Sequence, residues 1–299
     1  MQDWGGQAGA HATDGIQDKS WGTYLTSYVL AAIGFALGQA SPGRGVLLQV
    51  AQVSFLMEGA SWALDGIQHQ FCWEEGPPEH ILWAASTAFF VAATFAKACA
   101  ALLFLQESGI GLIGDVPGQG RLPLTAKVFG AVGAFFAILI PAVGLGNFTA
   151  GAWLELIVVK VVVLCAAIGF GVAGGAYAGS ALMFAGLGCS VVIQQARPSP
   201  WLRSPYFNDQ ALSHCMWMVH LAASFAVLQQ LHRHAWEAGE LAREEEEREA
   251  REARELEEER AAADGKGCIS LLGCSGTSNA HSPKHGSPSS AHSPHSPTR

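Results

Sequence analysis

The sequence predicts an all-α polytopic membrane protein, a bundle of seven transmembrane helices followed by a charged helix and a disordered C-terminal tail. Two observations predict this fold. Only 14% of the 299 residues are charged and half are hydrophobic, whereas soluble domains carry roughly 25% charged residues. Apolar runs of roughly 20 residues, the length that crosses a bilayer core, also recur along the chain.

Seven apolar runs predict the membrane helices, and turn-forming segments separate them. Pro- and Gly-rich breaks such as SPGRG at 41–45 and EEGPP at 74–78 mark their ends. Small residues within the runs predict close contacts between helices in lipid. The predicted helices are 21–40, 46–66, 80–105, 127–148, 152–173, 177–195 and 210–231.

The rest of the chain divides into a polar N-terminal segment, 1–20, and two segments that follow the transmembrane domain, 21–231. Segment 232–263 is rich in Glu and Arg, and the i,i+4 pairs Glu244–Arg248 and Glu247–Arg251 predict a solvated helix. Segment 264–299 cannot bury a core, so we expect it to be disordered. Phosphorylation would let this tail bind cytosolic proteins; its Ser-Pro sites are Ser282, Ser287, Ser293 and Ser296.

Charge predicts the orientation and excludes one class of partner. The acidic excess lies in the charged helix and the remainder is nearly neutral, so no basic patch predicts nucleic-acid binding. Basic residues predict a cytoplasmic C-terminus and a lumenal or extracellular N-terminus for this multi-pass protein. The cytoplasmic side would carry Arg44, Arg121, Lys127 and Arg233, against Lys19, Arg197 and Arg203 on the other.

Polar residues interrupt the apolar pattern in LDGIQHQFCWEEGPPEH, residues 64–80, between the second and third predicted helices. Seven alternating spans place this segment on the same membrane side as the start of the seventh helix, with Asp209 and His214. Asp65 and His69 are four residues apart, so they share a helical face. That spacing suits a carboxylate that orients or joins a metal-binding imidazole. Asp209 is also a candidate helix cap. These residues, with His80, are either a metal site or ordinary interfacial side chains.

A second polar layer lies deeper in the predicted bundle, at Glu58, Lys160 and His220. A rise of about 1.5 Å per residue gives them compatible depths. Glu58 and Lys160 could therefore form a buried ion pair, either structural or part of a substrate or proton pathway. We expect Lys97, near the far end of the third helix, to snorkel toward the interface.

Two short motifs resemble a known family. DGIQHQF at 65–71 and YFNDQALSHCMWMVHLAASF at 206–225 resemble the superfamily of seven-helix membrane hydrolases that includes the alkaline ceramidases and the progestin and adipoQ receptors. They are most similar to a bacterial and algal branch. The matching positions are Gly66, His69, Phe71, Phe207, Asn208, Leu212 and His214.

The resemblance implies that His69 and His214 hold a zinc ion whose water attacks a lipid amide. The enzymes have a second histidine four residues away in the seventh helix, but Gln210 and Met218 stand there in this chain. Asp65 replaces the serine that the enzymes place one turn before the second-helix histidine, which makes it the candidate general base. A third zinc ligand would come from Asp65, Asp209, His80 or His220.

Three functional hypotheses follow. The first is a zinc-dependent hydrolase of a lipid amide or ester. The second is a seven-helix receptor or lipid-binding protein without chemistry, which suits the incomplete ligand set. The third is a small proton-coupled transporter that uses Glu58, Lys160 and His220. A purely structural membrane protein remains as a further alternative.

Overall fold

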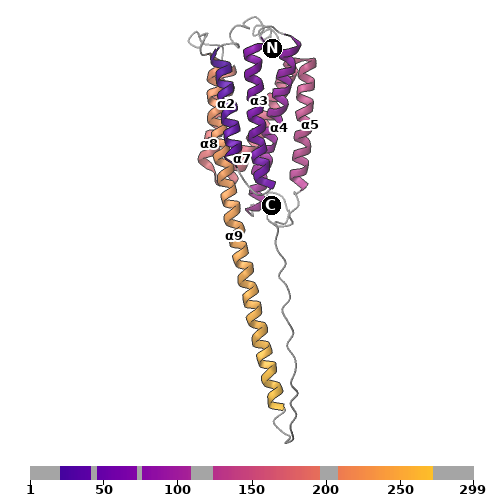
Figure 1. The fold of residues 1–299 in the computed structure, drawn as a ribbon, viewed down its shortest axis with the longest axis vertical. Coiled ribbons are helices and arrows are strands. Elements are labelled where there is room, and N and C mark those ends of the chain that lie inside the picture. The colour runs from indigo at the N-terminus through magenta and orange to yellow at the C-terminus, as the bar shows by residue number, and fades with distance from the viewer. Residues whose placement is uncertain (1–20, 42–45, 73–75, 109–123, 196–207, 272–299) are drawn as a thin grey trace, which may run out of the picture. The chain divides into compact units, whose positions relative to one another are not determined.

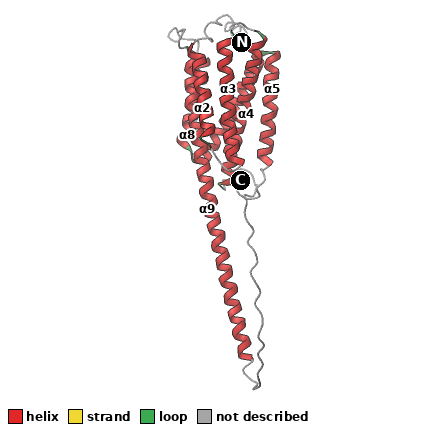
Figure 2. Cartoon of the chain, viewed as in Figure 1, coloured by secondary structure: helices red, strands yellow, loops and turns green. Residues whose placement is uncertain are grey.

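A computed structural model describes residues 21–41, 46–72, 76–108, 124–195 and 208–271. Every regular element in these ranges is a helix (Figure 2). The predicted N-terminal segment 1–20 and residues 272–299 of the predicted tail lie outside the described residues. The expected disorder and the Ser-Pro sites of the tail therefore stay predictions.

The helices follow the seven predicted ranges in order (Figure 1). The fifth range is one uninterrupted helical run whose middle is π-helical. Observed ends differ from predicted ends by a few residues, except that α3 extends to Phe71 and α9 far beyond its predicted end. The bounds are α2 Trp21–Gln39, α3 Val46–Phe71, α4 Pro77–Glu107, α5 Leu124–Gly146, α6 Phe148–Glu155, η1 Leu156–Val163, α7 Leu164–Ala173, α8 Tyr177–Gln195 and α9 Asp209–Leu271.

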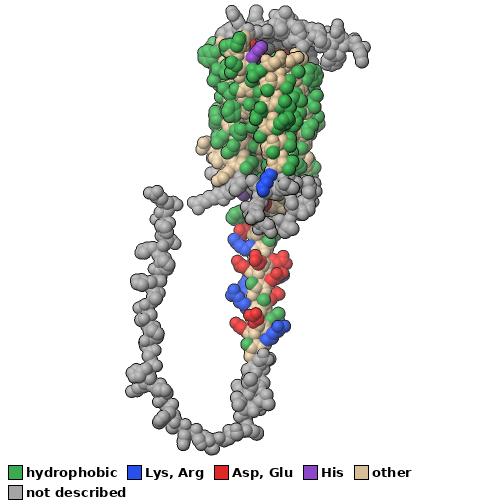
Figure 3. Space-filling view, turned by 90° about the vertical axis from the view of Figure 1, so that its right-hand side faces the viewer, with side chains coloured by type: hydrophobic (Ala, Val, Ile, Leu, Met, Phe, Trp, Pro, Cys, Tyr) green, Lys and Arg blue, Asp and Glu red, His purple; other side chains and the backbone are tan. Residues whose placement is uncertain are grey.

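Four helical runs in the described residues are long and apolar enough to cross a membrane, so the chain has the character of a multi-pass membrane protein. The outer surface of the bundle is accordingly covered with hydrophobic side chains in the face that Figure 3 shows. Residues such as Phe135, Ile138 and Phe184 are more than half exposed, as expected for side chains that face lipid. The four runs are Pro77–Glu107, Lys127–Gly146, Phe148–Ala173 and Asp209–Ala262.

Helix α4 packs on α3, α5 and α7, and α2 packs on α3. The approach of α2 to α3 requires glycine at two facing positions. A Cβ added to Gly34 would lie 2.8 Å from the Cα of Gly59, and a Cβ on Gly59 would lie 2.9 Å from the ring of Phe35. These glycines let the two backbones meet, as the small residues in the sequence predicted.

The seventh predicted helix and the separate charged helix, 232–263, are in fact one helix, α9. The chain nevertheless divides into two compact units after Arg243. In the second unit the predicted side-chain pairs differ from those observed. Arg248 contacts Glu245 and Glu252 at 3.5 and 3.7 Å, and Arg251 donates to the carbonyl of Glu247. All of these side chains are exposed.

Candidate functional site

Two of the predicted metal ligands and the predicted base come together where α2, α3 and α9 meet. We call Asp65, His69 and His214 the outer cluster. The Nε2 atom of His69 lies 3.5 Å from Oδ1 of Asp65, and the Nε2 atom of His214 lies 4.0 Å from Oδ2. The two imidazole rings are 6.5 Å apart between centroids. Because α3 continues to Phe71, His69 is helical and the predicted i,i+4 pairing with Asp65 forms.

Hydroxyl groups of α2 support the outer cluster from one side. Thr26 Oγ1 lies 2.9 Å from His214 Nδ1, and Ser27 Oγ donates to Asp65 Oδ2 at 2.7 Å. The hydroxyl of Thr26 has a carbonyl acceptor within its own helix, at Gly22 or Thr23, 2.6 and 2.9 Å away. We therefore assign the Thr26 oxygen as an acceptor from the His214 ring, with the ring proton on Nδ1.

This tautomer leaves a lone pair on His214 Nε2, and that nitrogen faces the carboxylate of Asp65. Two acceptors therefore stand 4.0 Å apart, an arrangement that a proton or a cation between them would stabilise. The amide nitrogen of Gln210 reaches His214 Nε2 at 3.4 Å, too long for a strong hydrogen bond.

Aromatic rings form the buried side of the outer cluster. Trp62 lies edge-on to His214, with 5.1 Å between ring centroids, and Trp217 and Phe90 pack behind it. His214 is fully buried, whereas the side chains of Asp65 and His69 keep 21% and 14% exposure. The cluster is thus dry on the His214 side and accessible on the side of Asp65 and His69.

Asn208 positions the start of α9. Its Oδ1 atom accepts from the amide of Ala211 at 2.9 Å and from the Thr23 hydroxyl at 3.0 Å. Asn208 is therefore the residue that caps the helix and ties it to α2. The sequence prediction that Asp209 caps α9 is wrong in this respect, because Asp209 Oδ1 accepts only from the adjacent amide of Gln210.

Two predicted candidates for the third ligand, His80 and His220, lie elsewhere. The His80 side chain is exposed and its ring stacks on Phe148 of α6. His220 is buried against α8, where its Nδ1 donates to the carbonyl of Met183 at 2.9 Å. No hydrogen bond or ion pair among the described residues joins His80, His220 or Asp209 to the outer cluster. Asp65 is the candidate that the fold brings to both histidines.

The deeper polar layer pairs differently from the prediction. Lys97 of α4 contacts Glu58 of α3, and Lys160 contacts Glu155 at 3.6 Å. The predicted pair of Glu58 with Lys160 is therefore wrong, and so is the expectation that Lys97 snorkels, since Lys97 is only 4% exposed. Glu155 and Lys160 are five residues apart, which the π-helical turn of η1 brings to one face.

The side chains of the outer cluster are of the kinds that bind zinc, but their positions are not those of a zinc site. One carboxylate and two imidazoles are frequent zinc ligands, and donors around tetrahedral zinc stand roughly 3.4 Å apart. The two pairwise distances, 3.5 and 4.0 Å, are near that value. Among the described residues, however, no group of three His, Cys, Asp or Glu side chains is arranged to hold a metal as it stands. The three donors would have to move closer together to hold one ion.

Sequence reasoning missed the hydroxyl residues of α2. Thr23, Thr26 and Ser27 recur at spacings of three and four, which places them on one helical face. That spacing is the signal that could have found them. Their buried positions against Asp65 and His214 show that this face points toward the outer cluster.

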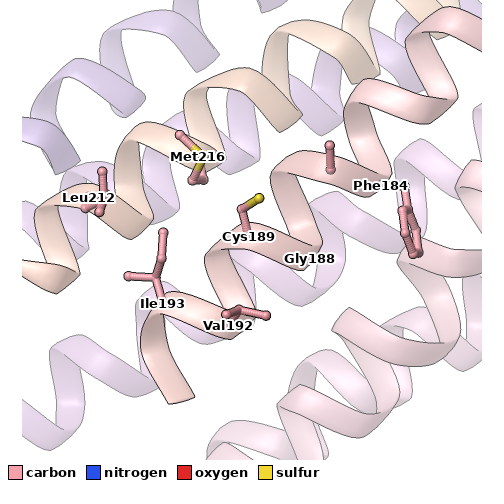
Figure 4. Close-up of a pocket in the computed structure, with 8 residues that line it drawn as sticks. Phe184, Gly188, Cys189, Val192, Ile193, Leu212 and Met216 are labelled. Atoms are coloured by element: carbon pink, nitrogen blue, oxygen red, sulfur yellow. The ribbon is translucent and has the colours of Figure 1, made fainter. Parts of the chain in front are cut away.

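An apolar groove lies between α8 and α9 on the exterior of the bundle (Figure 4), with a volume of about 540 Å³. Leu212 and Met216 line it from α9, each two residues from His214. Two residues turn a helix by roughly 200°, so the groove and His214 are on different faces of α9. The α8 side is lined by Phe184, Ala185, Gly188, Cys189, Val192 and Ile193.

The bundle also has a counterpart among protein families. Residues 22–233, more than half of the chain, match DUF6962, which is described as a family of unknown function. No curated protein matches the chain, and neither does any solved structure. The matched range begins in α2 and ends in α9, so it includes the outer cluster and its hydroxyl partners. The chain therefore belongs to the family DUF6962.

Proposed function

We propose that all seven helical runs cross the membrane and that the outer cluster binds zinc and hydrolyses an amide or ester of a membrane lipid. The observation that carries this proposal is the approach of His214 Nε2 to the carboxylate of Asp65, at 4.0 Å, which makes them facing acceptors in the assigned tautomer. A buried lone pair opposite a carboxylate calls for a cation. The resemblance to seven-helix hydrolases supports the same chemistry.

In this proposal His69 and His214 bind the metal through Nε2, and the carboxylate of Asp65 completes the set. Zinc bound there would supply a Lewis acid that activates water for attack on a carbonyl carbon. Thr26 would hold the His214 ring in the tautomer that leaves Nε2 free, from 2.9 Å. Ser27 would fix the Asp65 carboxylate through its 2.7 Å hydrogen bond.

The buried aromatic side of the outer cluster and its exposed side would have different roles. The aromatic rings of Trp62 and Trp217 exclude water behind His214, which strengthens electrostatic interactions within the cluster. One oxygen of the Asp65 carboxylate would hold the metal, and the other would accept the proton of the attacking water. A lipid carbonyl at the membrane interface would approach from the exposed side, near Asp65 and His69.

The proposal is tested with the purified full-length chain in lipid nanodiscs. N-acyl sphingoid amides, N-acyl ethanolamines and diacyl phospholipids are offered in turn, and released fatty acid is measured with and without a chelator. Asp65→Asn should lower the rate by roughly 10²–10⁴-fold, the usual contribution of a general base. His80→Ala is the matched control and should keep the wild-type rate. Cleavage of no substrate, or cleavage that Asp65→Asn leaves unchanged, would contradict the hydrolase.

A second candidate function, lipid binding without chemistry, is favoured by the apolar groove between α8 and α9. An acyl chain suits such an apolar surface in contact with lipid. A Met216→Trp substitution would fill the groove. Under this alternative it would abolish binding of a spin-labelled lipid, whereas the outer-cluster variants would leave that binding intact.

We also propose that the C-terminus is cytoplasmic and the N-terminus lumenal or extracellular, as the basic residues predict. The phosphorylated tail would then meet cytosolic proteins. Labelling of single cysteines at residues 2 and 299 by a membrane-impermeant reagent would separate the two orientations, since only the N-terminal cysteine should react in intact cells.

A further inference from the structure

Three ionisable side chains are buried in the interior of the bundle, deeper than the outer cluster. Glu58 and His220 have no exposed surface and Lys97 is 4% exposed. They belong to α3, α9 and α4, and we call them the inner site. Ionisable groups at such depth are costly in a membrane, and they characteristically form ion or proton pathways.

The inner site contains unsatisfied acceptors. Lys97 contacts Oε2 of Glu58, but Oε1 of Glu58 is buried and has no hydrogen-bond partner among the described residues. His220 donates from Nδ1 to the Met183 carbonyl, so its neutral ring presents a lone pair on Nε2, and that atom also has no partner. Unpaired buried acceptors of this kind indicate a missing donor, such as water or a proton.

A small cavity adjoins the inner site and has room for a water molecule. Lys97 lines it from α4, Met183 from α8 and Ser224 from α9. The space for the centre of a water is about 10 Å³, close to the roughly 10–15 Å³ that one buried water needs. Ser224 Oγ donates to the carbonyl of His220, so its lone pairs remain to accept from such a water.

A buried polar face of α3 leads from the inner site to the outer cluster. Ser54, Glu58, Ser61 and Asp65 are spaced by four, three and four residues, which places them on one side of the helix. Ser54 and Ser61 are buried as well. Glu58 and Asp65 are separated by two helical turns, roughly 10 Å, a distance that one or two hydrogen-bonded groups can bridge.

We propose that the inner site transfers protons, so that the protein moves protons through the membrane. In the transfer step an N–H bond of the Lys97 ammonium breaks and an O–H bond forms on Glu58, which leaves a neutral amine and a carboxylic acid. A hydronium ion gives a proton to His220 Nε2 and becomes water, and the His220 imidazolium then gives that proton to the amine of Lys97, which becomes an ammonium again. The carboxylic acid of Glu58 releases its proton to water on the side of Asp65, so each group returns to its starting state and one proton has moved. Protons enter and leave as hydronium at the two faces. This function does not depend on the hydrolase proposed for the outer cluster.

The test is proton entry into liposomes of phosphatidylcholine and phosphatidylglycerol that contain the full-length chain and an internal pH-sensitive dye. Potassium and valinomycin hold the membrane potential constant. Wild type should acidify the interior several-fold faster than protein-free liposomes. Glu58→Gln combined with Lys97→Met removes both charges together, which avoids leaving one uncompensated, and should reduce entry to the protein-free rate. Glu155→Gln, at the partly exposed ion pair of Glu155 with Lys160, is the control and should keep the wild-type rate.

A further variant keeps the outcome decisive. His220→Asn retains an N–H for the Met183 carbonyl but has no basic nitrogen, so it should also lose proton entry even if the double variant does not insert. Zinc that is retained by His220→Asn while proton entry is lost would separate the two proposals. Wild type at the protein-free rate, or both inner-site variants at the wild-type rate, would overturn the proton-transfer site.

Discussion

The outer cluster and the inner site solve the same problem, polar groups inside an apolar bundle, in different ways. The outer cluster keeps partial exposure at Asp65 and His69 and surrounds His214 with hydroxyl groups of α2. The inner site pairs Glu58 with Lys97 in complete burial and leaves two acceptor atoms unpartnered. The comparison indicates that support by neighbouring hydrogen bonds suits a ligand-holding site, whereas a buried charge pair with free acceptors suits proton movement.

The largest effect should come from breaking the buried pair. Lys97→Met leaves the Glu58 carboxylate uncompensated, which costs about 3–5 kcal/mol of stability in buried pairs. The combined Glu58→Gln and Lys97→Met change should restore most of that loss. Thermal unfolding in detergent measures both. A Lys97→Met protein as stable as wild type would show that the pair of Glu58 and Lys97 is not buried as described.

A smaller effect should come from the hydroxyl support of the outer cluster. Thr26→Ala removes the acceptor for His214 Nδ1–H, and loss of such an orienting group costs roughly 10–100-fold in metal affinity. Thr94→Ala is the matched control, because Thr94 is also buried in a helix but its hydroxyl bonds the carbonyl of Phe90. Competition titration of zinc against a chromophoric chelator measures the affinity. Equal losses of zinc affinity in the two variants would show that Thr26 does not support the site.

The helix cap that positions His214 should contribute less. Asn208→Ala removes the acceptor of the Ala211 amide, which costs about 1 kcal/mol at a typical N-cap. Asp209→Ala should cost distinctly less, since Asp209 accepts only from the neighbouring amide. Chemical unfolding followed by tryptophan fluorescence distinguishes them. A greater loss for Asp209→Ala would reverse the assignment of the cap.

The smallest effect is expected at the exposed charge pairs of α9. Arg248 contacts Glu245 and Glu252 in full exposure, where solvent screens the attraction. Arg248→Gln should therefore leave the unfolding midpoint unchanged within error, in contrast to Lys97→Met. A marked shift would mean that the second unit contributes to the stability of the bundle.

Much of this arrangement could be predicted from the sequence. Apolar length and turn residues placed all seven helical runs, and the four-residue spacing of Asp65 and His69 predicted their contact. The number of helices between them predicted that His214 lies at the same end of the bundle as Asp65 and His69. These features depend on local periodicity and on counting, which a sequence supplies directly.

The misses came from information that local patterns do not carry. Depth along a helix suggested Lys160 as the partner of Glu58, but depth says nothing about which helices are neighbours, and α4 supplies Lys97 instead. The π-helical turn that joins Glu155 to Lys160 has no clear sequence signature. The hydroxyl residues of α2 were missed because Thr and Ser in an apolar helix also serve as packing residues.

The metal content of the protein tests the central claim most directly. The full-length chain is purified with asparagine in place of the tail histidines His281, His285, His292 and His295, and zinc per chain is measured by elemental analysis. The account predicts about one zinc per chain, lost in His69→Ala and His214→Ala and retained in His80→Ala, since removing a ligand abolishes tight binding. Absence of zinc, or zinc that is indifferent to His69 and His214, would contradict it.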